Sequence, residues 1–139
     1  MPFKYFGKIN FTPYTKVDKF SDYLQKGKLM GTKCKICGEL YFPPRADCLK
    51  CMSDTFQWIE FSGRGKLHSF TKIYAAPKGF EDIAPYTLGV VDLEEGGRLI
   101  SWIGDIPEND LKINMKVKVV PRMFEEIPEI KLYYTIEKQ

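Results

Sequence analysis

The four cysteines of this 139-residue chain lie close together in the sequence, as two Cys-x2-Cys pairs separated by ten residues. The pairs are Cys34 with Cys37 and Cys48 with Cys51, and Gly38 follows the first pair. Each pair allows two thiolates to approach one ion from a tight turn. Four thiolates complete the tetrahedral coordination of zinc and leave no open position, so the spacing predicts one structural, non-catalytic zinc site. Iron in the same four-thiolate cage is the alternative metal.

Disulfide bonds and redox chemistry are the other interpretations of these cysteines. The N-terminal segment MPFKYFGKINFTPYTK has no apolar core of the kind found in secretion signals. We therefore expect a cytoplasmic protein, whose thiols stay reduced. Two Cys-x2-Cys pairs together indicate a metal more strongly than a redox centre. No stretch approaches the ~18 consecutive apolar residues of a membrane span, and we expect no membrane association.

The composition is that of a globular protein, with 44% hydrophobic and 28% charged residues. The net charge of +3 is unevenly distributed. Residues 1–33 carry seven basic and two acidic side chains, whereas residues 61–139 carry eleven basic and twelve acidic ones. A nucleic-acid-binding domain is usually strongly basic. The balance in the C-terminal half therefore argues against nucleic-acid binding.

The hydrophobic periodicity predicts one helix before the cysteines. Val17, Phe20 and Leu24 share one face of a helix over residues 16–27, and Gly27 is a plausible end. The spacer between the cysteine pairs is long enough for a two-stranded ribbon with a turn at Pro43–Pro44. Such a small piece of chain has too little core to fold without a metal.

After the ribbon, the apolar residues alternate as they do in strands. A helical turn is expected at residues 107–111, and Pro121 should lie at a bulge or a sheet edge. Five antiparallel strands fit an OB-fold barrel, with an SH3-like barrel or an open meander as alternatives. We expect a mainly β protein with three parts: an N-terminal helical segment (1–32), a zinc ribbon (33–59) and an OB-fold (60–139). The predicted strands are residues 63–76, 86–93, 98–104, 115–124 and 130–137.

Several short motifs follow one another in a specific order around and after the cysteines. In this order they resemble the acyl-CoA-associated zinc-ribbon/OB-fold family of archaea and bacteria, from about residue 15 to the end. The motifs are Phe42-Pro43-Pro44-Arg45, Ser62-Gly63-Arg64-Gly65, Pro85-Tyr86 and Val91-Asp92-Leu93.

The resemblance implies a rubredoxin-like zinc ribbon before the OB-fold and a role beside thiolase-superfamily enzymes. Archaeal members of this kind lie between an acetoacetyl-CoA thiolase and a 3-hydroxy-3-methylglutaryl-CoA synthase, where they scaffold the two enzymes and help hold CoA. Other members are paired with other thiolase-like or lipid-transfer proteins. We therefore expect a scaffold that binds acyl-CoA or CoA and associates with a thiolase-type enzyme.

Candidate CoA-binding residues follow from what the ligand needs, which is cations for its phosphates and an aromatic face for adenine. The long connection between the first two barrel strands borders the ligand groove in many OB-folds. The candidates are Lys33, Arg45 and Arg64, which flank the ribbon in sequence, and Phe70, Lys78, Phe80 and Tyr86, which lie in or near that connection.

Two other functions compete with this one. A zinc ribbon beside an OB-fold could bind single-stranded nucleic acid by stacking bases on aromatic residues in a basic groove, which is the alternative function. An enzyme would need a nucleophile and a base. His68 is the only histidine, every cysteine belongs to the predicted metal site, and no nucleophile-elbow pattern is present. We therefore expect a protein that is not an enzyme.

Overall fold

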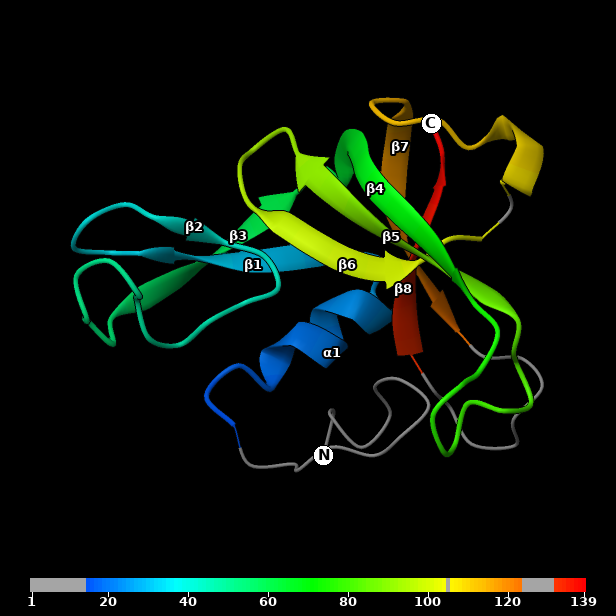
Figure 1. Ribbon diagram of the computed structural model, residues 1–139. Helices are drawn as coiled ribbons and strands as arrows, with labels where there is room; N and C mark the ends of the chain where they lie inside the picture. Colours follow the sequence, from blue (N-terminus) through cyan, green and yellow to red (C-terminus); the bar gives the residue numbers. More distant parts are fainter. Residues whose placement is uncertain (1–14, 105, 124–131) are drawn as a thin grey trace.

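The computed structural model describes residues 15–104, 106–123 and 132–139, and the expectations for residues 1–14 lie outside this part. One short helix and a small three-stranded sheet precede a larger five-stranded sheet (Figure 1). The elements are α1 (Lys19–Gln25), β1 (Leu29–Cys34), β2 (Leu40–Tyr41), β3 (Phe56–Phe61), β4 (Arg64–Ile73), β5 (Tyr86–Leu93), β6 (Arg98–Trp102), the 3-10 helix η2 (Glu108–Asp110), β7 (Lys116–Met123) and β8 (Leu132–Lys138).

Helix α1 is shorter than predicted, because residues 16–18 form a turn and the helix begins at Lys19. The predicted apolar face is present: Phe20 and Leu24 are buried and Val17 is half-buried. Gly27 follows the helix with a left-handed φ of 80°, the conformation in which glycine ends helices without strain. No helix in the described part of the chain has the length and apolarity required to cross a membrane.

The ribbon is a three-stranded sheet with β1 in the centre, not the predicted two-stranded ribbon. Strand β1 pairs with β3 along its whole length, from Leu29 opposite Phe61 to Cys34 opposite Phe56. It pairs with β2 at only two positions. The prediction missed β3 as a ribbon strand because its pairing partner is more than twenty residues away in the sequence.

The five-stranded sheet has the strand order β6-β5-β4-β7-β8, and all neighbours are antiparallel. A parallel bridge between Ile103 and Ile136 joins the end of β6 to β8 and brings the two edges of the sheet together. The Gly104 N–H strengthens this closure by donating to the Ile136 carbonyl at 2.9 Å. The result is the predicted five-stranded OB-fold and not an open meander.

Two irregularities shape the barrel strands. The β4–β5 register shifts between Leu67 and Ser69, which places His68 at a bulge. Strand β7 pairs with β4 only over residues 116–118, so Pro121 lies beyond that pairing and faces Tyr134 of β8 alone. The predicted edge position of Pro121 is therefore confirmed, for the physical reason that proline cannot donate to a ladder.

One apolar core runs through both sheets and the helix. Phe20 of α1, Phe42 after β2, Phe61 of β3 and Tyr134 of β8 meet at the junction. The Phe42 ring centroid lies 5.4 Å from that of Phe61, 5.7 Å from that of Tyr134 and 6.0 Å from that of Phe20. We call these four rings the aromatic junction. The predicted limits of the ribbon (33–59) and the OB-fold (60–139) remain a prediction.

A second contact ties the two sheets at the same place. The Ser62 N–H, between β3 and β4, donates to the Glu95 carboxylate at 2.6 Å, and this hydrogen bond favours the ionised carboxylate. Desolvation opposes this effect, and the net result is a lowered pKa of Glu95. Its second oxygen, Oε1, is buried and accepts no hydrogen bond from the described protein groups.

Substitution of Phe20 tests whether the aromatic junction holds the helix, the ribbon and the barrel together. We expect Phe20→Ala to lower the free energy of unfolding by about 3–5 kcal/mol, because the buried ring is lost while alanine favours the helix. Urea unfolding followed by tryptophan fluorescence measures the change. Gln25→Ala, at an exposed position of the same helix, is the matched control. If both substitutions changed the free energy of unfolding equally and only slightly, the helix would not hold the ribbon and the barrel together.

Candidate metal centre

The sulfur atoms of all four cysteines lie within 4.8 Å of one another. Cys34 Sγ is 3.5 Å from Cys51 Sγ, and Cys37 Sγ is 3.5 Å from Cys48 Sγ. Four sulfurs about 2.3 Å from a tetrahedral zinc ion would be about 3.8 Å apart, so this cluster has the size and the ligand chemistry of a zinc site. The four side chains would complete the coordination, which leaves no position for a substrate.

Two similar turns present the sulfurs. In the first, the Gly38 N–H donates to the Cys34 carbonyl at 3.0 Å, and in the second the Met52 N–H donates to the Cys48 carbonyl at 3.1 Å. Gly38 and Met52 both have a left-handed backbone, with φ of 81° and 64°. Glycine adopts this conformation freely, whereas methionine does so at a cost of about 1–2 kcal/mol. The second turn is therefore held in place by its surroundings.

Tyr41 supports the second turn from β2. Its hydroxyl lies 3.3 Å from Cys48 Sγ and accepts the Leu49 N–H at 2.9 Å. Donation from this hydroxyl, together with the Cys51 N–H at 3.5 Å, lowers the pKa of the Cys48 thiol to about 6. Tyr41 thus stabilises a ligand in its metal-binding, ionised form.

The four thiols do not ionise alike. A hydrogen bond from the Cys37 N–H lowers the pKa of Cys34. The pKa of Cys51 is instead raised to about 12, because the Ser53 N–H is outweighed by the Cys34 sulfur and by desolvation. Without metal, Cys34 and Cys48 therefore ionise first. A dication bound by all four thiolates would displace the remaining protons.

Two of the three candidate CoA-binding residues of the ribbon and its junction with the barrel, Arg45 and Arg64, make local contacts. Lys33 is half-buried on β1. The Arg45 guanidinium lies 5.9 Å from the centre of the Tyr41 ring, and its backbone N–H and C=O both bond to the buried Thr32 hydroxyl. Arg64 Nε lies 3.3 Å from Glu94 Oε2. None of these contacts tests CoA binding, which remains a prediction for all three residues.

The other candidates lie around the β4–β5 connection. Phe80 and Tyr86 pack edge-on against Trp102, with ring centroids 6.0 and 6.3 Å away. Tyr133 of β8 completes this aromatic cluster at 5.6 Å from Trp102. Tyr133 was not among the predicted site residues, because only the β6–β8 closure brings it beside Trp102. Lys78 is exposed in the same connection.

Phe70 lies on β4, partly exposed and directly opposite Gly89 of β5.

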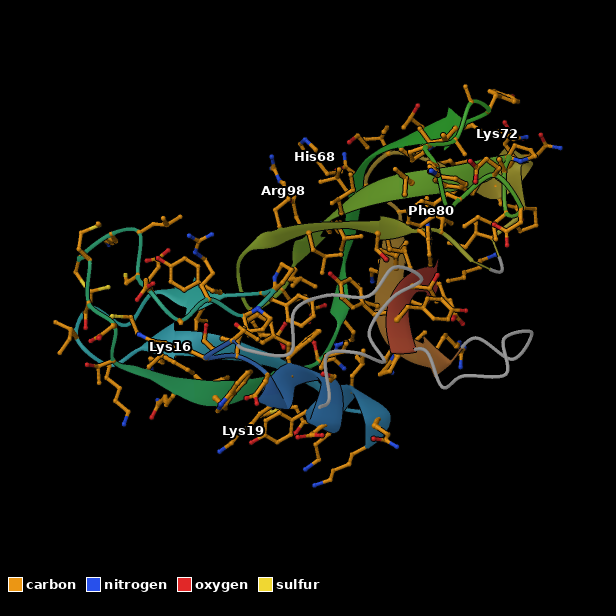
Figure 2. All side chains as sticks on the ribbon, turned by 90° about the horizontal axis from the view of Figure 1, so that it is seen from below. Lys16, Lys19, His68, Lys72, Phe80 and Arg98 are labelled. Atoms are coloured by element: carbon orange, nitrogen blue, oxygen red, sulfur yellow. The ribbon has the colours of Figure 1, made fainter. Side chains whose placement is uncertain are left out.

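The ribbon and the β4–β5 connection lie at opposite ends of the molecule in both views (Figures 1 and 2). The structure therefore does not bring Lys33 and Arg45 together with Lys78 and Phe80. These residues form two separate groups and do not line one binding site.

His68 stands on the outer surface of the barrel. Its Nδ1 lies 3.2 Å from Asp92 Oδ2, and Arg98 Nε lies 2.5 Å from the other oxygen of the same carboxylate. Arg98 is the main cause of the lowered pKa of Asp92. Within residues 15–104, 106–123 and 132–139, no hydroxyl is hydrogen-bonded to His68. The geometry is that of an exposed ion-pair cluster.

The hydrogen bond from Tyr41 predicts a pH-dependent effect on metal binding. In Tyr41→Phe, the pKa of Cys48 should rise from about 6 towards the ordinary value of about 8.5, so a proton competes better with the metal between these limits. We expect about tenfold weaker zinc binding near neutral pH and a smaller loss above about pH 9. Competition with a chromophoric chelator measures the affinity, and Tyr74→Phe is the control. Equal losses at both pH values would contradict this role.

Comparison with known proteins agrees with the fold and the site. Residues 21–57 match the family model of the ChsH2 rubredoxin-like zinc ribbon domain, and residues 58–122 match that of the ChsH2 C-terminal OB-fold domain. A solved structure named as the Ltp2-ChsH2(DUF35) aldolase is similar with a TM-score of 0.67 and 27% identity, covering 84% of this chain and 89% of that chain.

Curated relatives carry two kinds of name. A DUF35 domain-containing scaffold protein of Methanocaldococcus jannaschii is 42% identical over 70% of each chain. The benzoylsuccinyl-CoA thiolase subunit BbsA of Thauera aromatica is 35% identical over 57% of this chain and 54% of that protein. The predicted family resemblance is confirmed: the chain belongs to the family of ChsH2-type zinc-ribbon/OB-fold proteins that includes the DUF35 scaffold proteins.

Proposed function

We propose that this protein is a non-catalytic accessory subunit, or scaffold, of a thiolase-type enzyme. The observation that carries the proposal is the gathering of all four cysteines into one cluster within 4.8 Å. Thiolase-type acyl transfer needs a nucleophilic thiol, and a thiol committed to a metal cannot serve. The partner would therefore supply the nucleophile. The names of the relatives, a scaffold protein and a thiolase subunit, support this division of labour.

The partner is proposed only as a class. An acetoacetyl-CoA thiolase and a hydroxymethylglutaryl-CoA synthase are the partners that the family resemblance implies. The solved relative is named as an aldolase formed by Ltp2 and ChsH2, which supports pairing with an enzyme while leaving the reaction open. For this chain, the role of the zinc ion would be structural. It would hold the two turns of the ribbon in a rigid arrangement that a partner can recognise.

We further place acyl-CoA at the β4–β5 connection, not at the ribbon. Lys78 offers a cation for a phosphate, and two residues later Phe80 joins an aromatic cluster with Tyr86 and Trp102. Adenine stacks on such rings, and the pantetheine arm needs an apolar path. Arg45 belongs to the ribbon, where its backbone bonds to Thr32 of β1 and its guanidinium already contacts the Tyr41 ring.

The alternative of single-stranded nucleic-acid binding has less support. It requires a basic groove beside the aromatic residues. The β4–β5 connection instead carries Lys78 together with the exposed Glu81 and Asp82. Among its described residues, this connection therefore has more negative than positive charge, which does not attract a polynucleotide.

Calorimetry with acetyl-CoA tests the ligand site. We expect the isolated protein to bind weakly, Lys78→Ala to weaken binding by about tenfold through loss of a charge-assisted contact, and Arg45→Ala to leave it unchanged. Arg45→Ala is the matched control, because it removes one cation from the ribbon and none from the β4–β5 connection. If only Arg45→Ala lowered the affinity for acetyl-CoA, the binding site would lie at the ribbon instead. No binding at about 1 mM ligand would contradict an intrinsic site.

Affinity capture tests the accessory role. The tagged protein, isolated from its native source, should retain a thiolase-type enzyme with measurable thiolysis of acetoacetyl-CoA, whereas the purified chain alone should have none. Removing the metal with a chelator before capture should abolish retention, because the ribbon then loses its fixed shape. Thiolysis by the purified chain itself would refute the proposal. Retention that survives metal removal would show that the ribbon is a fold element only.

A further inference from the structure

Like charges face each other across β4 and β7 on the outer surface of the barrel. In the antiparallel register, Arg64 lies directly opposite Lys118, and Lys66 lies directly opposite Lys116. All four residues are exposed. Directly opposite side chains point to the same face with Cβ atoms about 4.5–5.5 Å apart, and like charges in this position destabilise a sheet. The protein therefore carries a cost in stability at this place.

In the part of the chain that the structure describes, only Arg64 of the four opposed cations has an ion-pair partner, Glu94, and the two other acidic side chains nearby pair with arginines outside this group. Asp92 lies opposite Lys66, and Glu137 lies opposite Lys118, yet neither forms an ion pair with that lysine. Within the described residues, Lys66, Lys116 and Lys118 have no ion-pair partner, and we call them the lysine face. The arginine pairs are Arg64 with Glu94, Arg98 with Asp92 and Arg122 with Glu137.

The lysine face is separate from the aromatic cluster around Trp102. It lies on β4 and β7, the first and fourth strands of the barrel, whereas OB-folds bind oligonucleotides on the second and third strands. The two rows of opposed side chains contain no aromatic residue on which a base could stack. The surface therefore offers point charges without stacking, which suits carboxylates better than a nucleic acid.

We propose that the lysine face binds an acidic segment of a partner protein. Lys116 and Lys118 are two residues apart on one strand, so their side chains are about 6.6 Å apart along it. An extended segment with carboxylates at alternate positions has the same spacing and would lie along β7, with Lys66 beside it. Such a segment would remove the repulsion that the folded chain leaves unbalanced. This inference rests on the accessory role proposed above, which requires a partner.

A labelled peptide tests the lysine face without the enzyme. The probe is an eight-residue fluorescein-labelled peptide in which glutamate alternates with threonine, and anisotropy measures binding. We expect binding at ~0.01 M salt that disappears at ~1 M, because the Debye length falls from ~30 to ~3 Å. The variant K66Q/K116Q/K118Q, which removes the three charges, should lose affinity by about tenfold or more. It should also melt at the same or a higher temperature, because the opposed charges are gone.

The matched control is K16Q/K19Q/K28Q, which changes the net charge equally. In Figure 2, Lys16 and Lys19 lie on the side of the molecule away from His68 and Arg98 of the barrel face. This variant should keep affinity within about threefold of the wild type. Equal losses in both variants would reduce the effect to net charge and overturn the proposal. Tighter binding of a thymidine oligonucleotide, lost in the first variant, would overturn it in favour of nucleic acid. Absence of peptide binding at low salt would overturn the proposal for the lysine face. The accessory role would still be tested independently by affinity capture.

Discussion

The structure depends on the aromatic junction of Phe20, Phe42, Phe61 and Tyr134. The ribbon alone is too small to bury a core, since β2 contributes only two residues to its sheet. The junction gives it one by extending the apolar core of the barrel through Phe42 and Phe61. Because helix α1 adds Phe20 to the same cluster, the helix, ribbon and barrel share one apolar core.

Different interactions thus stabilise the two ends of the ribbon. At the barrel end, apolar burial and the hydrogen bond from Ser62 to Glu95 orient it. At the far end, the four thiols lie within 4.8 Å, and a metal ion bound by all four would hold the two turns together. Tyr41 links the ends: it belongs to β2 and its hydroxyl contacts Cys48. We therefore expect that removal of the metal would disorder the two turns and then β2.

Closure of the barrel separates the remaining surface into two chemically different regions. The β6–β8 contact assembles Trp102 with Tyr133 at the β4–β5 end, where an aromatic ligand group can pack. The β4–β7 pairing gathers the lysine face, where carboxylates can bind. The CoA site and the peptide site proposed above would therefore have no residue in common.

The sequence by itself determined the features that depend on neighbours along the chain. The Cys-x2-Cys spacing places two sulfurs in one turn, period-two alternation marks the barrel strands, and Gly27 ends the helix, so all of these were predictable. Tertiary structure alone decided the third ribbon strand, the separation of Lys33 and Arg45 from Lys78 and Phe80, and the pairing of Lys66 with Lys116. These features depend on strand register between distant segments, and register is chosen by the packing of the whole core.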